Sequence, residues 1–140
     1  MILQTSDEPS VMEYLALTRL ITEFGWIVDH KEGPEAFSRL FTDDAQLSGP
    51  GFELHGLGEI MDHARKQATR DRISRHDYGA LRITETGDDI IRGCVLVTAH
   101  FSETIDGTPK TSTGIADSFD LFRRERGLWK FAERKLEVVF

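Results

Sequence analysis

Apolar residues recur at spacings of three and four between positions 11 and 28 of the chain. The residues of this series are Val11, Leu15, Leu17, Leu20, Ile21, Phe24, Ile27 and Val28. The spacing predicts one long amphipathic helix, with Ser6 as its cap and Pro9 near its first turn. Gly33-Pro34 cannot continue a helix, so we expect this one to end between His30 and Glu32.

Shorter periodic segments follow the long helix. A second helix is predicted over residues 34–41, and a third over residues 56–69. Between them, residues 45–47 and 52–54 favour two short strands, because the Gly-Pro-Gly turn at 49–51 separates two apolar runs.

From residue 73 onward the pattern changes to that of strands. Runs suited to strands cover residues 73–86, 89–102, 113–124 and 129–140, and glycine-containing turns separate them. Helices followed by an antiparallel meander indicate an α+β fold. A long curved sheet wrapped around the first helices would form a cone whose open mouth holds a small apolar ligand. Because the chain has no repeat, linker or low-complexity segment, we expect residues 1–140 to form a single domain.

Composition narrows the range of partners. The formal net charge of −7 repels nucleic acid and anionic lipid, so neither is an expected partner. No apolar run approaches the roughly 20 residues that span a bilayer. The N-terminus lacks the basic start and apolar block of a signal peptide. The single cysteine, Cys94, excludes an internal disulfide and fits a reducing compartment, so a cytoplasmic location is predicted.

Several motifs of catalysis are missing from the sequence. The chain has no HExxH or CxxC spacing for a metal, no glycine-rich phosphate loop and no GxSxG elbow. We therefore expect no metal and no cofactor.

Two distant residues suggest proton chemistry. Asp29 stands at the end of the predicted long helix, where the helix dipole disfavours a negative charge. His76 lies in the strand-like run 74–78, and its unperturbed pKa of about 6.5 suits acid–base work near neutral pH. A carboxylate and an imidazole that meet in a pocket form a general base with an orienting partner. The alternatives are a solvent-facing Asp29 and a His76 that is simply exposed or satisfied by neighbours.

Four ordered segments resemble the SnoaL-like branch of the NTF2-like, or cone-fold, superfamily. They are Trp26-Ile27-Val28-Asp29 with the following Leu40-Phe41-Thr42-Asp43-Asp44-Ala45, then Leu54-His55-Gly56, Ser74-Arg75-His76, and the hairpin run from Phe122 to Phe131. The resemblance implies an α+β, cystatin-like cone of about three N-terminal helices on a curved, mostly antiparallel sheet that encloses a pocket. It is more specific for the fold than for an activity, because one fold hosts many chemistries.

The resemblance also assigns roles to individual residues. Scytalone dehydratase and hexachlorocyclohexane dehydrochlorinase are members with an Asp and a His in matching places, which implies that Asp29 and His76 form a catalytic dyad. His100 is the match for a second catalytic histidine of scytalone dehydratase. For substrate contacts we expect Trp26, Phe52, Tyr78, Phe122 and Asp120, although such aromatics can also serve only the core, and Asp120 can face the solvent.

Two positions depart from the pattern of the family. Gly25 stands where many relatives have a tyrosine, and Ser118 stands where many carry an aromatic residue. Both changes remove bulk, so a different or larger ligand is expected.

The resulting hypothesis is a cofactor-independent lyase of the dehydratase type. The Asp29–His76 dyad would abstract a proton from a small apolar or aromatic ring compound. Alternatives are isomerase or polyketide-cyclase-type proton transfer, and a non-catalytic role in ligand binding or assembly like that of the dioxygenase β subunit. Because the sheet face away from the pocket needs cover, a homodimer or higher homo-oligomer is predicted.

Overall fold

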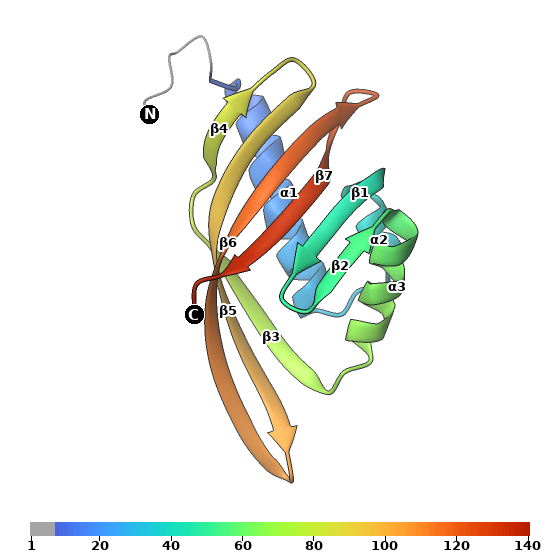
Figure 1. Cartoon of the computed structure of the whole chain (residues 1–140), viewed down its shortest axis with the longest axis vertical. Helices are drawn as coiled ribbons and strands as arrows, with labels where there is room; N and C mark the ends of the chain where they lie inside the picture. Colours follow the sequence, from blue (N-terminus) through green and yellow to red (C-terminus); the bar gives the residue numbers. More distant parts are fainter. Residues whose placement is uncertain (1–7) are drawn as a thin grey trace.

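The computed structural model describes residues 8–140, and it shows three helices packed against a curved sheet (Figure 1). Helix α1 spans Val11–Asp29. Ser10 caps it in a capping box, because the Ser10 hydroxyl accepts the Glu13 N–H while the Glu13 carboxylate accepts the Ser10 N–H. The cap predicted at Ser6 lies outside the described residues. The predicted end of the helix is confirmed, since His30 is the residue that follows its last turn.

The next elements are α2 (Glu35–Ser38), β1 (Phe41–Gly49), β2 (Phe52–His55) and α3 (Leu57–Ala68). The predicted helix over 34–41 is therefore too long. Phe41 instead begins β1, where it pairs with Phe131 of the last strand, and the Phe131 N–H donates to the Leu40 carbonyl at 2.7 Å. Pairing with a distant strand thus overrides the local helical spacing.

Five further strands complete the sheet: β3 (Arg72–Tyr78), β4 (Arg82–Thr86), β5 (Ile90–Ile105), β6 (Thr108–Glu125) and β7 (Leu128–Val138). The strand order is β2-β1-β7-β6-β5-β3, and β4 also pairs with β5. The β1–β7 pair is parallel and the other pairs are antiparallel. The predicted α+β cone with a curved, mostly antiparallel sheet is confirmed.

The run 73–86, predicted as one strand, is divided between β3 and β4. Tyr78 pairs with Val97, and Arg82 pairs with Cys94, so three residues on this side face two residues of β5. The extra residue produces a bulge that bends the edge of the sheet.

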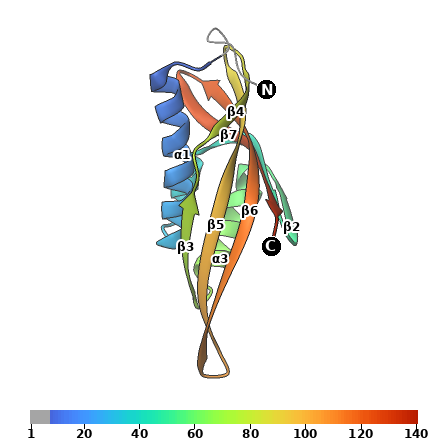
Figure 2. The same ribbon diagram turned by 90° about the vertical axis from the view of Figure 1, so that its left-hand side faces the viewer.

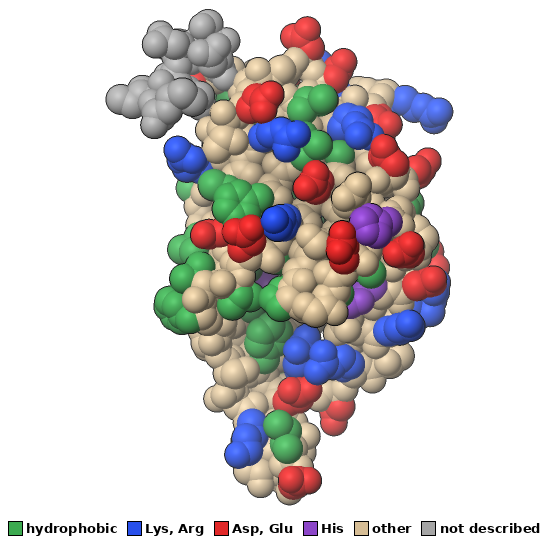
Figure 3. All heavy atoms as spheres, viewed as in Figure 1, with side chains coloured by type: hydrophobic (Ala, Val, Ile, Leu, Met, Phe, Trp, Pro, Cys, Tyr) green, Lys and Arg blue, Asp and Glu red, His purple; other side chains and the backbone are tan. Residues whose placement is uncertain are grey.

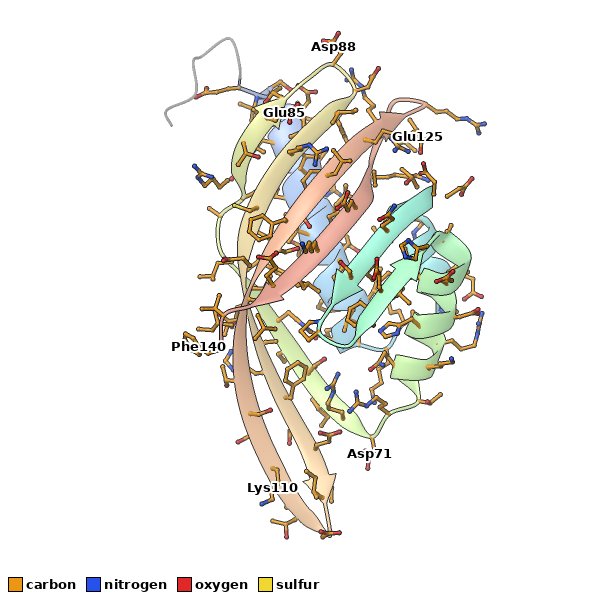
Figure 4. All side chains as sticks on the ribbon, in the orientation of Figure 1. Asp71, Glu85, Asp88, Lys110, Glu125 and Phe140 are labelled. Carbon is orange, nitrogen blue, oxygen red and sulfur yellow. The ribbon has the colours of Figure 1, made fainter. Side chains whose placement is uncertain are left out.

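Strands β5 and β6 form a long hairpin that extends past the body of the molecule, with Lys110 near its tip (Figures 1 and 4). Asp106 and Gly107 both have positive φ, 51° and 77°, as a two-residue hairpin turn of type I′ requires. The two strands therefore extend further toward the turn than the predicted runs, which end at residue 102 and begin again at residue 113.

The core lies between α1 and the sheet, and α1 covers one side of the sheet (Figure 2). Three fully buried phenylalanines form its centre: Phe41, Phe122 and Phe131. Phe24 of α1 packs edge-on against Phe41 and Phe131. No helix among residues 8–140 is long and apolar enough to cross a membrane.

Candidate active site

A cavity of about 570 Å³ lies between the helices and the concave part of the sheet. Residues of α1, α3 and strands β3, β5, β6 and β7 line it, and most of them are apolar. Polar groups enter this apolar lining at a few places, among them Ser74, His76, Tyr78 and Arg134. An apolar hollow with a few convergent polar groups is the usual form of a small-molecule site.

Strand β3 contributes three of these polar side chains because of its alternation. Ser74, His76 and Tyr78 are two residues apart, so they share the face of the strand that lines the cavity. Arg75 and Asp77 lie on the opposite face, which is exposed. Alternation along β3 thus brings Ser74, His76 and Tyr78 together at the cavity wall.

Asp29 and His76 meet at this wall of the cavity. Oδ1 of Asp29 lies 2.6 Å from Nδ1 of His76. Oδ2 of Asp29 accepts the backbone N–H of His76 at 2.9 Å, and the Ser74 hydroxyl donates to Oδ1 at 2.8 Å. The side chains of His76 and Asp29 are only 14% and 7% exposed. These hydrogen bonds hold the carboxylate at the end of α1 against the strand.

This contact fixes the tautomer of the imidazole when His76 is neutral. A carboxylate accepts hydrogen bonds, so Nδ1 carries the proton and Nε2 has a free lone pair. Among residues 8–140, no side chain or backbone group forms a hydrogen bond with Nε2 of His76. His76 lines the cavity, so the arrangement can accept a proton from a bound molecule.

A second charged pair lies deeper in the same region. Nε of Arg134 donates to Oδ1 of Asp120 at 2.8 Å, and Nη2 donates to Oδ2 at 3.3 Å. Nη2 also donates to the Ser118 hydroxyl at 3.0 Å, and that hydroxyl donates to Asp120 at 2.8 Å. The side chains of Arg134 and Asp120 are 1% and 0% exposed.

Arg134 combines these bonds with aromatic contacts. Its guanidinium carbon lies 4.6 Å from the ring centre of Phe24 and 4.5 Å from that of Phe131. Arg134 is one of the residues that line the cavity, and its guanidinium is close enough to the Tyr78 hydroxyl to lower the pKa of that group. Because a guanidinium keeps its proton, Arg134 places a fixed positive charge in an apolar region.

Tyr78 lies beside this pair. Burial raises the pKa of the Tyr78 hydroxyl to about 12, and the positive charge of Arg134 only partly opposes this rise. The hydroxyl is therefore neutral near pH 7 and can donate a hydrogen bond to a bound molecule.

The two small residues that depart from the family pattern do not enlarge the cavity. A Cβ at Gly25 would lie 2.7 Å from Cε2 of Tyr78 and 2.8 Å from its hydroxyl oxygen, so Tyr78 already occupies that space. Ser118 is fully buried against Arg134 and Asp120. The expected gain in room from these two positions is therefore wrong.

His100 lies away from the cavity. It belongs to the outer face of β5, where Nε2 is 3.3 Å from Oδ2 of Asp77 and Nδ1 is 3.1 Å from the Thr113 hydroxyl. Its neighbours Ala99 and Phe101 line the cavity instead, because adjacent residues of a strand point to opposite faces. The prediction that His100 reaches the site is wrong.

The predicted substrate contacts divide into two groups. Phe52 and Tyr78 line the cavity as expected. Trp26 does not, because it is 53% exposed and stacks on His30 at the end of α1. Phe122 is core, with its ring centre 5.2 Å from that of Phe131. Asp120 is bonded to Arg134 and is itself not part of the lining.

Sequence reasoning missed His63, which lines the cavity from α3. Its ring stacks on Phe52 with ring centres 4.7 Å apart. Burial lowers the pKa of His63, and the nearby Lys66 lowers it further. Its helical spacing from Ile60, which is buried, was the signal that could have placed it on the inner side.

Arg134 was also missed by sequence reasoning. It alternates with Ala132 and Leu136 along β7, and this apolar spacing was a signal that it faces inward. Among residues 8–140, no group of three or more His, Cys, Asp or Glu side chains is arranged to hold a metal ion.

Comparisons with known proteins agree with this architecture. The family model of the SnoaL-like domain matches residues 9–135. No curated protein matches the sequence significantly.

Solved structures with similar folds include a candidate scytalone dehydratase from Novosphingobium aromaticivorans. It is 22% identical, with a TM-score of 0.79 over 93% of this chain and 86% of that one. A hexachlorocyclohexane dehydrochlorinase is 18% identical, with a TM-score of 0.82 over 93% and 87%. A protein with a cystatin-like fold from Nostoc punctiforme is 21% identical, with a TM-score of 0.77 over 94% of both chains. At these identities the likeness concerns the fold.

Proposed function

The chain belongs to the SnoaL-like domain family, and from this membership and the geometry of its cavity we propose that it catalyses a cofactor-independent elimination. The observation that carries the proposal is the 2.6 Å contact between Asp29 and His76, which lies at the wall of an apolar cavity. The resemblance of the fold to a dehydrochlorinase and to a candidate dehydratase supports the same class of reaction.

His76 acts as the base in this mechanism. Its Nε2 takes a proton from a carbon beside an electron-withdrawing group of the substrate. The electrons of the broken C–H bond form a C=C bond, and the leaving group departs with the electrons of its own bond to carbon. Asp29 holds the Nδ1–H of His76 and stabilises the imidazolium that forms. Such base catalysis contributes about 10² to 10⁴ in rate.

Arg134 and Tyr78 stabilise the charge that develops on the other side of the substrate. Arg134 supplies a fixed positive charge in the lining of the cavity, and the neutral Tyr78 hydroxyl beside it supplies a hydrogen-bond donor. Both groups are held in place before the substrate binds, so they need little rearrangement as negative charge appears. A leaving hydroxide takes back the proton from His76 as water, and a leaving halide departs as the anion while His76 returns its proton to solvent.

A substrate survey tests the proposal directly. The purified chain is incubated in D₂O with cyclic β-hydroxy ketones and chlorinated cyclic compounds, and NMR follows loss of water or chloride and exchange of the acidic C–H. We expect elimination by the wild type and a loss of about 10² to 10⁴ in rate for His76→Gln.

His100→Gln is the matched control for this experiment. His100 also has a carboxylate neighbour, Asp77, but it lies on the outer face of the sheet. Its replacement should leave the rate unchanged. Equal rates for His76→Gln and the wild type would remove the base assignment. Exchange of the C–H for deuterium without loss of a leaving group would favour an isomerase, and binding without either reaction would favour a ligand-binding role.

A further inference from the structure

Three cationic side chains line the cavity where it opens between α3 and the start of β3: Lys31, Arg70 and Arg72. In the space-filling view, Lys and Arg side chains gather in this region between α3 and β3 (Figure 3). The gathering is unusual for this chain, because its formal net charge is −7. A local positive site in an acidic protein attracts anions to one place.

Nearby carboxylates neutralise only part of this positive charge. Nη2 of Arg70 lies 3.1 Å from Oε1 of Glu103, so Arg70 is paired. Nζ of Lys31 donates to the backbone carbonyl of Arg70 at 2.5 Å, and Glu32 also lines this part of the cavity. Two carboxylates thus stand against three cations.

Arg72 has neither an ion pair nor a side-chain hydrogen bond among the described residues, whereas Lys31 is bonded to the Arg70 carbonyl. Within residues 8–140, no carboxylate oxygen lies within 4.0 Å of its guanidinium nitrogens. The neighbouring Asp71 is not part of the cavity lining, and its side chain points away from the body at the turn before β3 (Figure 4). An anion bound in the cavity would therefore meet a guanidinium that still has free donors.

The guanidinium of Arg72 is held in a defined place. Its central carbon lies 4.4 Å from the ring centre of Phe101, which also lines the cavity. Burial lowers the pKa of Arg72, and the adjacent Arg70 lowers it further, while Glu103 opposes both effects. The group still keeps its proton at any physiological pH. A partly desolvated cation of this kind gains more from an anionic partner than a fully hydrated one does.

Arg72 and His76 stand on the same face of β3. They are four positions apart, which corresponds to about 13 Å between their Cα atoms at the rise of a strand. Ala99 and Phe101 of the neighbouring β5 supply apolar wall along this path. A ligand that reaches both Arg72 and His76 therefore needs an apolar body that spans this interval.

We propose that the molecule bound in this cavity is a ring compound with a carboxylate, and that Arg72 binds the carboxylate at the mouth. If His76 acts as the base proposed above, this carboxylate places the reactive C–H of the substrate near Nε2. The two oxygens of a carboxylate match the planar fork of a guanidinium, so one such group can take two hydrogen bonds from Arg72.

A pair of probes that differ only in charge tests this site. Binding of 2-naphthoate and of its neutral analogue 2-naphthamide to the whole chain is measured by calorimetry. We expect the carboxylate to bind about tenfold more tightly than the amide, as a charge-assisted hydrogen bond at a partly exposed site provides. Arg72→Gln should remove the preference, and Arg72→Lys should restore part of it.

Arg65→Gln is the matched control. Arg65 lies on the exposed side of α3, pairs with Asp62 at 2.6 Å and does not line the cavity. The variant should keep the full preference for 2-naphthoate. Equal affinities of the two probes for the wild type, no measurable binding of 2-naphthoate, or a preference that survives in Arg72→Gln would each overturn the proposal.

The same measurement on His76→Gln separates this inference from the proposed reaction. The preference for 2-naphthoate should persist in that variant, since Arg72 is unchanged. A preserved preference with no elimination by the wild type would support the carboxylate site and contradict the lyase. Elimination by the wild type without a preference for 2-naphthoate would support the lyase and contradict the carboxylate site.

Discussion

The β3–β5 ladder carries a histidine–carboxylate pair on each of its two faces. On the inner face, His76 and Asp29 are 2.6 Å apart, and both side chains are largely buried. On the outer face, His100 and Asp77 are 3.3 Å apart, and their side chains are 49% and 80% exposed. Residues 76 and 77 are neighbours in sequence, so the alternation of one strand separates the two pairs.

The difference between the two pairs shows that environment, and not residue type, decides what such a pair can do. On the outer face, water competes for both partners and screens their charges, so the pair contributes little. On the inner face, the Ser74 hydroxyl and the backbone N–H of His76 fix the carboxylate, and the imidazole faces a cavity. Only the inner pair combines a held orientation with access to a bound molecule.

The pair formed by Asp120 and Arg134 is completely buried. Breaking it should cause the largest loss of stability among the three pairs. Asp120→Ala leaves the guanidinium of Arg134 buried without its carboxylate. We expect a loss of about 3 to 5 kcal/mol in the free energy of unfolding, measured by urea denaturation.

The double variant Asp120→Leu with Arg134→Leu is the control for this prediction. It removes both charges together, so its stability should stay within about 2 kcal/mol of the wild type. Its rate of elimination should fall, because the fixed positive charge of Arg134 is gone. A single Asp120→Ala variant as stable as the wild type would show that water reaches this pair.

The second-largest effect on stability should come from Asp29, the carboxylate of the inner pair, and Asp77, the carboxylate of the outer pair, should have a smaller one. Asp29→Ala removes the acceptor of the Ser74 hydroxyl, the His76 N–H and Nδ1 of His76. Because these donors are partly buried, we expect a loss of about 2 kcal/mol. Asp77→Ala should change the stability by less than about 0.5 kcal/mol. Equal losses in thermal unfolding experiments would contradict the distinction between the two faces.

The structure places His76 of β3 in the cavity lining, as the dyad hypothesis requires, whereas His100 of β5 lies on the outer face, contrary to expectation. Alternation groups His100 with Leu96, and these two do share a face. It does not say which face is buried, because Leu96 on the outside is as apolar as Val95 and Val97 on the inside. The answer depends on how β5 pairs with its neighbours and on where α1 lies, which are long-range properties.

The sequence did not predict the pair between Asp120 and Arg134, because the pair depends on one register shift between β6 and β7. Near the turn at 126–127, Phe122 pairs with Phe131, and the same register would place Asp120 opposite Glu133. A shift between Leu121 and Phe122 instead brings Asp120 opposite Arg134. A bulge of one residue leaves no clear mark in this sequence, although it decides which charges meet inside the protein.

A smaller effect is expected from the hydroxyl that shares the inner face with His76. Tyr78→Phe removes a neutral donor from the cavity and keeps the ring that fills the space beside Gly25. We expect the rate of elimination to fall about tenfold, which is less than the roughly 10² to 10³ lost with one donor of an oxyanion hole, because the charge of Arg134 remains.

Tyr14→Phe is the control for the loss of a hydroxyl. The Tyr14 hydroxyl donates to the Leu81 carbonyl at 2.9 Å, away from the cavity lining. Its removal should lower the stability by about 1 kcal/mol and leave the rate unchanged. If the two variants show equal rates, Tyr78 has no part in the reaction.

The smallest effect concerns His63, an inner-side histidine without a carboxylate partner among the residues described. Burial lowers its pKa in the folded chain, so the unfolded chain binds the proton more readily. The stability that comes from keeping His63 neutral is therefore complete above about pH 6.5 and is lost as the pH falls toward the lower folded value. His63→Phe and His63→Gln both lack the titrating group, so their melting temperatures should fall less than that of the wild type between pH 7 and pH 5. The difference should be below about 2 °C, because His63 remains partly exposed. Flatter profiles in both variants would trace the effect to the proton, and profiles as steep as that of the wild type would show that His63 contributes nothing to it.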